Sequence, residues 1–166
     1  MIWERKAQSA VWGVVAMLVF IAIAAGRVDI YRLYAARNWA YAVAQEAAMA
    51  GASRGRDWTA LLSDGAIRLN AATAQTEAEQ IVQQEMAARG ISGYVAEVRV
   101  LPDAAGGSIA GFPPRPVRLG TGMGNWSSDE PAVGVYLEVR VNWVMLDMLS
   151  TSLKTVRVFS AAGVAQ

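Results

Sequence analysis

The feature that most constrains this chain is a stretch near its start that carries no charge. From Ala7 to Gly26 the sequence reads AQSAVWGVVAMLVFIAIAAG and contains no Asp, Glu, Lys or Arg. The hydrocarbon core of a bilayer is about 30 Å thick, and roughly 20 helical residues at about 1.5 Å each cross it. The stretch is therefore just long enough to span a membrane as one helix, and we expect it to do so.

Two other interpretations fit the same stretch. A cleavable signal peptide would use Arg5 and Lys6 as its basic start and Ala22-Ile23-Ala24 as a small-x-small cleavage site. A buried helix of a soluble protein would need protein on every side, and the residues after Gly51 are too few to wrap it. We therefore expect a retained anchor in the cytoplasmic membrane.

The charges on the two sides of the anchor are nearly balanced, with Arg5 and Lys6 before it and Arg27, Arg32 and Arg37 after it. Because so short a tail precedes the anchor, we expect the N-terminus in the cytoplasm and the main domain in the periplasm or outside the cell. Charged and aromatic residues that flank the anchor are expected at the membrane interfaces, namely Trp3, Arg5, Lys6, Arg27, Asp29, Tyr31 and Arg32.

The residues after the anchor are expected to continue the same helix. No proline or glycine occurs from Val28 to Ala50, and alanine, the best helix former, is abundant. The sequence thus predicts one helix from about Ala7 to Ala50, with Gly51 just past its end. A row of alanines at four-residue spacing would let another backbone approach closely, either the chain's own sheet or another subunit. The candidates for packing on a partner along this helix are Tyr34, Ala36, Ala40, Ala44 and Ala48.

The remaining residues predict a small α+β head. An amphipathic helix is expected from about Ala71 to Arg89, with Asn70 as its N-cap. Three segments alternate apolar and polar residues, which predicts a three-stranded antiparallel sheet with one polar face and with helices on the other. The expected organisation is a tail, a transmembrane helix, its extramembrane continuation and a head, over residues 1–6, 7–26, 27–51 and 52–166.

A long loop, residues 102–132, separates the first two predicted strands and is rich in glycine and proline. Loops of this length inside a compact domain are usually functional or disordered. Its FPPRP segment favours an extended polyproline II conformation that can dock on an aromatic groove, and a solvated excursion with local turns is the alternative. The two aromatic residues of the loop, Phe112 and Trp126, are further candidates for packing on a partner.

The composition argues against several classes of function. The net charge is +1, which gives no indication of nucleic-acid binding. The chain has no cysteine and no histidine, so disulfides, the usual structural zinc sites and the commonest nucleophile–base pairs are excluded. Its Gly-rich segment GTGMGN does not follow a predicted strand and is no phosphate loop. We therefore expect no catalytic, cofactor-binding or metal-binding residues, no small-molecule substrate and no enzymatic activity.

A combination of segments points to a family. The apolar anchor is followed by Asp29, by RLYAAR and by an alanine-rich run that ends in AAMAGA. The segment LNAATAQTEAEQIVQQEMAARG and the closing strands VYLEVRVNWVMLDML and TVRVFSAAGVA follow. This arrangement resembles the TadE/TadG-like family, the membrane-anchored, pilin-like proteins of tight-adherence (Flp) pilus systems of bacteria. The resemblance implies a pilin-like head and a role as a minor pilin or assembly factor, with the lipid bilayer and other membrane protein subunits as partners.

One departure from the pilin pattern leaves a second function open. Pilin-type precursors usually carry a glycine at the processing site and a glutamate a few residues into the mature apolar helix. Here Glu4 precedes the apolar stretch, and the first glycine, Gly13, lies inside it. The alternative is an accessory structural subunit of a large membrane complex, respiratory or photosynthetic, that reuses the same scaffold.

Overall fold

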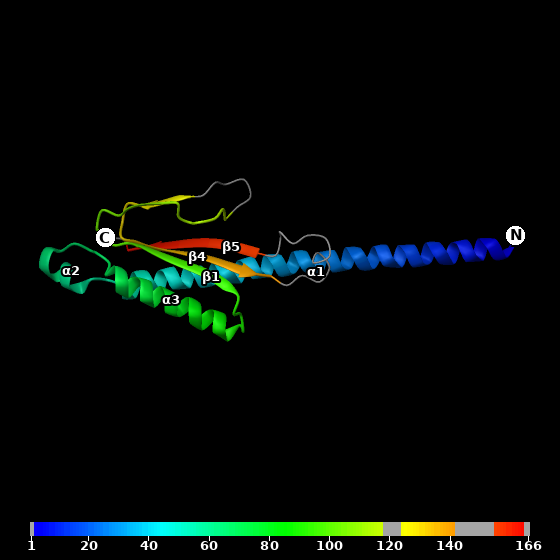
Figure 1. Cartoon of the computed structure of the whole chain (residues 1–166), viewed down its shortest axis with the longest axis horizontal. Coiled ribbons are helices and arrows are strands. Elements are labelled where there is room, and N and C mark those ends of the chain that lie inside the picture. Colours follow the sequence, from blue (N-terminus) through cyan, green and yellow to red (C-terminus); the bar gives the residue numbers. More distant parts are fainter. Residues whose placement is uncertain (1, 118–123, 142–154, 165–166) are drawn as a thin grey trace.

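One long helix is the largest element of the molecule. The computed structural model describes residues 2–117, 124–141 and 155–164, with side chains from residue 10 onward. Helix α1 runs unbroken over Ile2–Arg54, and its N-terminal part extends far beyond the rest of the chain (Figure 1). The predicted continuous helix, apolar at its start and joined to a head at its end, is confirmed. Its end is corrected, because Gly51 lies inside the helix and not past it.

The head is built on a three-stranded antiparallel sheet, as predicted. Strands β1 (Tyr94–Leu101), β4 (Ala132–Arg140) and β5 (Thr155–Gly163) lie in the order β1-β4-β5. The register places Val98 opposite Val135, and Leu137 opposite Val158. Because side chains alternate between the two faces of a sheet, these residues gather on one apolar face.

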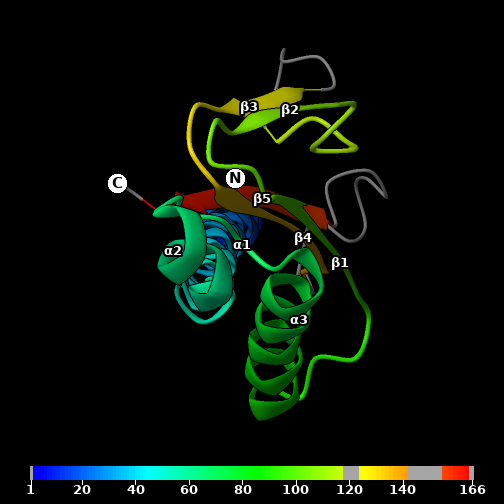
Figure 2. The same ribbon diagram turned by 90° about the vertical axis from the view of Figure 1, so that its left-hand side faces the viewer.

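Two helices cover that face. Helix α3 (Ala71–Ala88) lies beside α1 under the sheet (Figure 2), where α1 contacts β4 and β5 and α3 contacts β1. The side chain of Asn70 accepts a hydrogen bond from the Thr73 backbone N–H at 3.1 Å, so the predicted N-cap is confirmed. The main core lies between these two helices and the sheet, and includes Val43, Ala44, Ala78, Val82, Met86, Val135, Leu137 and Val158.

The opposite face of the sheet is also covered, which the sequence did not predict. Strands β2 (Gly107–Ala110) and β3 (Asn125–Ser128) pair with each other and form a layer over this face (Figure 2). A second buried cluster lies beneath them, made of Leu101, Phe112, Trp126, Ala132 and Tyr136. The expectations of one long loop and of a fully polar outer face are therefore corrected.

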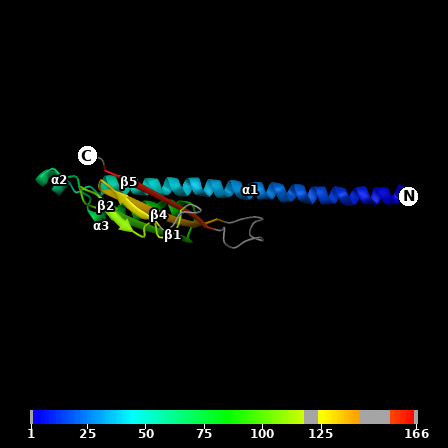
Figure 3. The ribbon, with the colours of Figure 1, turned by 90° about the horizontal axis from the view of Figure 1, so that it is seen from above.

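A short helix, α2 (Trp58–Asp64), forms the end of the head that lies farthest from the N-terminus (Figures 1 and 3). The Asp57 side chain begins this helix by accepting hydrogen bonds from the backbone N–H groups of Thr59 and Ala60, at 3.0 and 3.1 Å. None of the residues of α2 is buried. Two of its apolar side chains, Trp58 and Leu62, are 59% and 87% exposed.

Candidate functional site

The first candidate site is the apolar half of α1, which no described part of the chain covers. Residues 10–24 are all exposed, and Phe20 and Trp12 remain 73% and 67% exposed. By length and composition this helix could cross a membrane. Soluble monomers rarely expose so large a contiguous apolar surface, because leaving it in water is unfavourable. The apolar half of α1 is therefore a candidate membrane-contact segment.

The residues predicted at the membrane interfaces lie in different surroundings. Arg27, Tyr31 and Arg32 are exposed on α1 directly after the apolar half. Asp29 is fully buried and takes part in an interaction within the chain. Its assignment to a lipid interface is therefore corrected. Trp3, Arg5 and Lys6 lie in α1, and their side chains are outside the described part of the structure.

The alanine row of α1 packs on the chain's own core. Ala40, Ala44 and Ala48 are 0% exposed and Ala36 is 6% exposed, in the cluster that α1 forms with the sheet and α3. Small side chains at these positions let the sheet lie close to the helix backbone. Of the two alternatives left by the sequence, the structure shows the contact with the chain's own sheet. The choice of these four alanines for packing on a partner is corrected, because they offer no free surface.

The aromatic residues of the long loop are also covered. Phe112 and Trp126 are 2% and 8% exposed, and their ring centroids lie 5.9 Å apart. Both rings contact the sheet over Gly134, where an added Cβ would lie 3.0 Å from the Trp126 ring and 3.1 Å from the Phe112 ring. Gly134 thus allows the close approach of the outer layer. The choice of Phe112 and Trp126 for packing on a partner is corrected, because they stabilise the chain's own second cluster.

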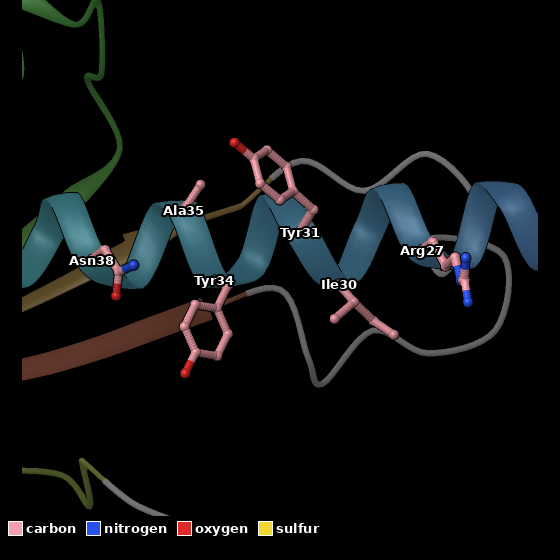
Figure 4. Close-up of a pocket in the computed structure, with 6 residues that line it drawn as sticks. All are labelled: Arg27, Ile30, Tyr31, Tyr34, Ala35 and Asn38. Carbon is pink, nitrogen blue, oxygen red and sulfur yellow. The ribbon is translucent and has the colours of Figure 1, made fainter.

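The other side of α1, away from the alanine row, is open. Tyr34 is 67% exposed, as expected for a residue that meets a partner, and Ile30 and Tyr31 are 62% and 74% exposed. A hollow of about 470 Å³ lies on this side (Figure 4), lined by Arg27, Ile30, Tyr31, Tyr34, Ala35 and Asn38. Tyr31 and Tyr34 point to opposite sides of the helix in this view and frame the hollow. This surface directly follows the candidate membrane-contact segment.

A polar cluster lies on the outer face of the sheet, around Glu138. Its carboxylate accepts hydrogen bonds from the Tyr136 hydroxyl at 2.8 Å, from Arg115 Nη1 at 3.0 Å and from Arg157 Nε at 3.2 Å. Burial pushes the pKa of Glu138 upward, but the hydrogen bond from Tyr136 and the two guanidinium groups outweigh it, so this pKa is lowered. Burial, and then the hydrogen bond to Glu138, raise the pKa of Tyr136 above its ordinary value.

These pKa directions suit a structural role. The Glu138 carboxylate stays ionised between two cations, and the Tyr136 phenol stays neutral, so neither group is poised to exchange a proton near neutral pH. The cluster ties the segment after β2 to β4 and β5. The alternation of apolar and polar residues in β4 places Glu138 on the outer face, but the alternation of one strand cannot show that Arg157 lies opposite it in β5.

Two further observations bear on ligand binding. A second hollow of about 420 Å³ adjoins the Glu138 cluster and is lined by Gly93, Tyr94, Val95, Arg115, Glu138 and Arg140. Within the described ranges, no group of three or more Asp or Glu side chains is placed to hold a metal ion. Among the described residues, the main exposed apolar surfaces are therefore the apolar half of α1, the surface of α1 around Tyr34, and the tip formed by α2.

No protein-family model, no curated protein and no solved structure matches this chain. The resemblance to the TadE/TadG-like family consequently depends on the sequence segments quoted above.

Proposed function

We propose that this chain is a single-pass membrane protein that acts through protein–protein contacts, as a TadE/TadG-like minor pilin or assembly factor. The supporting observation is the division of α1. Its first half is apolar and exposed, and its second half forms the core of a head built on a three-stranded sheet. A helix divided in this way suits a protein that is anchored in lipid and presents a rigid head in water.

The character of the head also supports a contact function. Apart from Val95 on β1, its exposed large apolar side chains lie on α1 and α2 and include Tyr34, Tyr41, Met49 and Trp58. Interface cores are enriched in aromatic residues and Met. The partly buried Glu138 carboxylate is paired with Arg115 and Arg157 and ties the segment after β2 to β4 and β5. We place the N-terminus in the cytoplasm and the head in the periplasm or outside the cell.

Membrane anchoring and orientation can be tested on the intact chain. The chain contains no cysteine, so a single introduced thiol reports on one position. We choose Ser53→Cys, because Ser53 is exposed at the head end of α1. In intact bacterial cells, we expect a membrane-impermeant maleimide to label this variant, and we expect the protein to resist carbonate extraction. Extraction by carbonate would overturn the anchor, and labelling only after lysis would overturn the orientation.

The second candidate function is an accessory structural subunit of a larger membrane complex, respiratory or photosynthetic. The exposed apolar side chains of Trp58 and Leu62 favour it, because α2 lies at the end of the molecule opposite the anchor (Figure 1) and leaves these side chains free for contact with another subunit. Shearing the cells separates the two functions. Recovery of the chain with sheared filaments supports the pilus role. Loss of a large native complex in mild detergent in the Leu62→Asp variant supports the subunit role.

A further inference from the structure

We propose that the exposed side of α1 pairs with α1 of a second copy as a parallel, two-stranded coiled coil centred on Asn38. This inference depends on the membrane anchoring proposed above, because two anchors inserted in the same direction hold their helices parallel. The pairing surface, here called the seam, consists of Arg27, Tyr31, Tyr34, Asn38, Tyr41 and Gln45.

The spacing of the seam is that of a coiled coil. Its six positions are separated alternately by four and three residues, which keeps them on one stripe of a slightly supercoiled helix. All six residues are exposed, and the buried alanine row lies on the other side of α1. Figure 3 shows the described part of the head on one side of α1, so two heads would point away from each other when the seams meet.

The residues that line the hollow on α1 have the spacing that this pairing requires. In a coiled coil each inward side chain fits into a hole made by residues i, i+3, i+4 and i+7 of the facing helix. The six residues that line the hollow form two successive holes of this kind. The first consists of residues 27, 30, 31 and 34, and the second of residues 31, 34, 35 and 38. Figure 4 shows Tyr31 and Ala35 along one edge of this surface and Ile30 and Tyr34 along the other.

The polar residues of the seam favour a second copy over an unrelated helix. An amide group carries both hydrogen-bond donors and acceptors, so Asn38 can pair with Asn38 of the partner copy at the same height. A single inward asparagine is known to fix the register and the two-stranded state of parallel coiled coils. Gln45 repeats this arrangement one heptad later. Arg27 lies at the end of the apolar half, where its guanidinium can turn toward lipid phosphates.

The seam has a natural end toward the head. The next position with this spacing would be Ala48, which is 0% exposed inside the chain's own core. Pairing therefore stops where the sheet and α3 close around α1. Toward the anchor the same spacing continues through Ala24, Phe20 and Met17, all of them exposed.

Cysteine cross-linking in native membranes tests the seam directly, because a disulfide requires two Cα atoms within about 7 Å. We compare Tyr34→Cys and Tyr41→Cys with Glu46→Cys, a control that is also exposed on α1 and lies outside the seam. After mild oxidation we expect a disulfide-linked dimer in most of the chains for both seam variants, and only a trace for Glu46→Cys. Equal cross-linking at all three positions, or none at the seam, would overturn the pairing.

A charge variant provides the second measurement. Asn38→Asp places two carboxylates opposite each other in the pair, whereas Ser53→Asp adds the same charge beyond the seam. By mass measurement in mild detergent, we expect two chains per particle for the wild type and for Ser53→Asp, and one chain for Asn38→Asp. A wild type with one chain, or with more than two, refutes the two-stranded coil. Carbonate extraction of the same membranes distinguishes failure of the pairing from failure of the membrane anchoring. If the chain resists extraction but does not cross-link, only the pairing is wrong. If carbonate extracts the chain, the proposed function is wrong as well.

Discussion

Gly51 of α1 lies directly against the backbone of Ala74 in α3. A Cβ atom added at Gly51 would be only 2.7 Å from the carbonyl oxygen of Ala74, and 3.1 Å from the Ala78 side chain. The two helices therefore touch at a point where only a hydrogen atom fits. The glycine that looked like the end of a helix is instead the place where two helices of the head meet.

This contact makes Gly51→Ala a test of the packing of the head. In an exposed helix, alanine is more favourable than glycine by roughly 1 kcal/mol. Here the added methyl group meets a rigid backbone, so we expect the free energy of unfolding to fall by about 1–3 kcal/mol. Chemical denaturation of the full chain in mild detergent measures it. The control is Gly93→Ala, where nothing lies within 4 Å of the added Cβ, and an increase in stability for Gly51→Ala would contradict the packing.

Part of this architecture could be read from local patterns. Alanine content without proline predicted the continuous α1, alternation predicted the three strands of the sheet, and Asn70 marked the start of α3. The outer layer could not be predicted in this way. Tyr136 and Phe159 occupy outward positions of their strands, and only the register places them opposite each other beneath Phe112 and Trp126.

The surface of α1 shows the same limit of prediction from local sequence patterns. A helical pattern tells which residues share a face but not what covers that face. The alanine row and Tyr34 both lie on α1, yet the sheet covers the alanines and leaves Tyr34 exposed. Asp29 next to the apolar half looked like an interface charge, yet it is 0% exposed and takes part in an interaction within the chain.

The outer layer should contribute measurably to stability. Trp126 contacts Phe112 and Phe159, with ring centroids 5.9 and 6.0 Å away. We expect Trp126→Ala to lower the free energy of unfolding by about 3–5 kcal/mol, since it removes a large buried side chain. Trp58→Ala removes the same side chain at a position that is 59% exposed, and it should change stability by less than about 0.5 kcal/mol. Similar losses in the two variants would show that β2 and β3 do not cover the sheet.

The Glu138 cluster predicts how stability depends on acid. The pKa of Glu138 is lowered from 4.5 in the folded chain, so the unfolded chain binds a proton first as the pH falls. The contribution of the carboxylate is therefore complete above about pH 4.5 and is lost as the pH falls through the lower folded pKa. We expect Glu138→Gln to cost about 1–3 kcal/mol near neutral pH, and the difference from the wild type to shrink in acid.

The matched control for this prediction is Glu97→Gln on β1. Glu97 also pairs with an arginine, Arg99, at 2.7 Å, but the Arg99 side chain is 54% exposed. Pairs near the surface contribute roughly 0–1 kcal/mol, so this variant should follow the wild type closely over the same pH range. Denaturation curves at several pH values compare the three proteins. If the free energy of unfolding differs between Glu138→Gln and the wild type by the same amount at every pH, ionisation of the Glu138 carboxylate is not the source of the stabilisation.

The apolar half of α1 makes the last prediction, which separates anchoring from folding. Leu18 is 61% exposed in the middle of this half, and Met49 is 55% exposed where α1 belongs to the head. An arginine near the centre of a spanning helix costs roughly 2.5–3.5 kcal/mol of insertion free energy, whereas an arginine in water costs almost nothing. We therefore expect Leu18→Arg to reduce the carbonate-resistant fraction of the chain, and Met49→Arg to leave it unchanged. Neither side chain belongs to a described core cluster, so both variants should keep the unfolding free energy of the wild-type head. If Leu18→Arg instead unfolds the head while the chain stays in the membrane, the apolar half packs on protein and its role as an anchor in lipid is wrong.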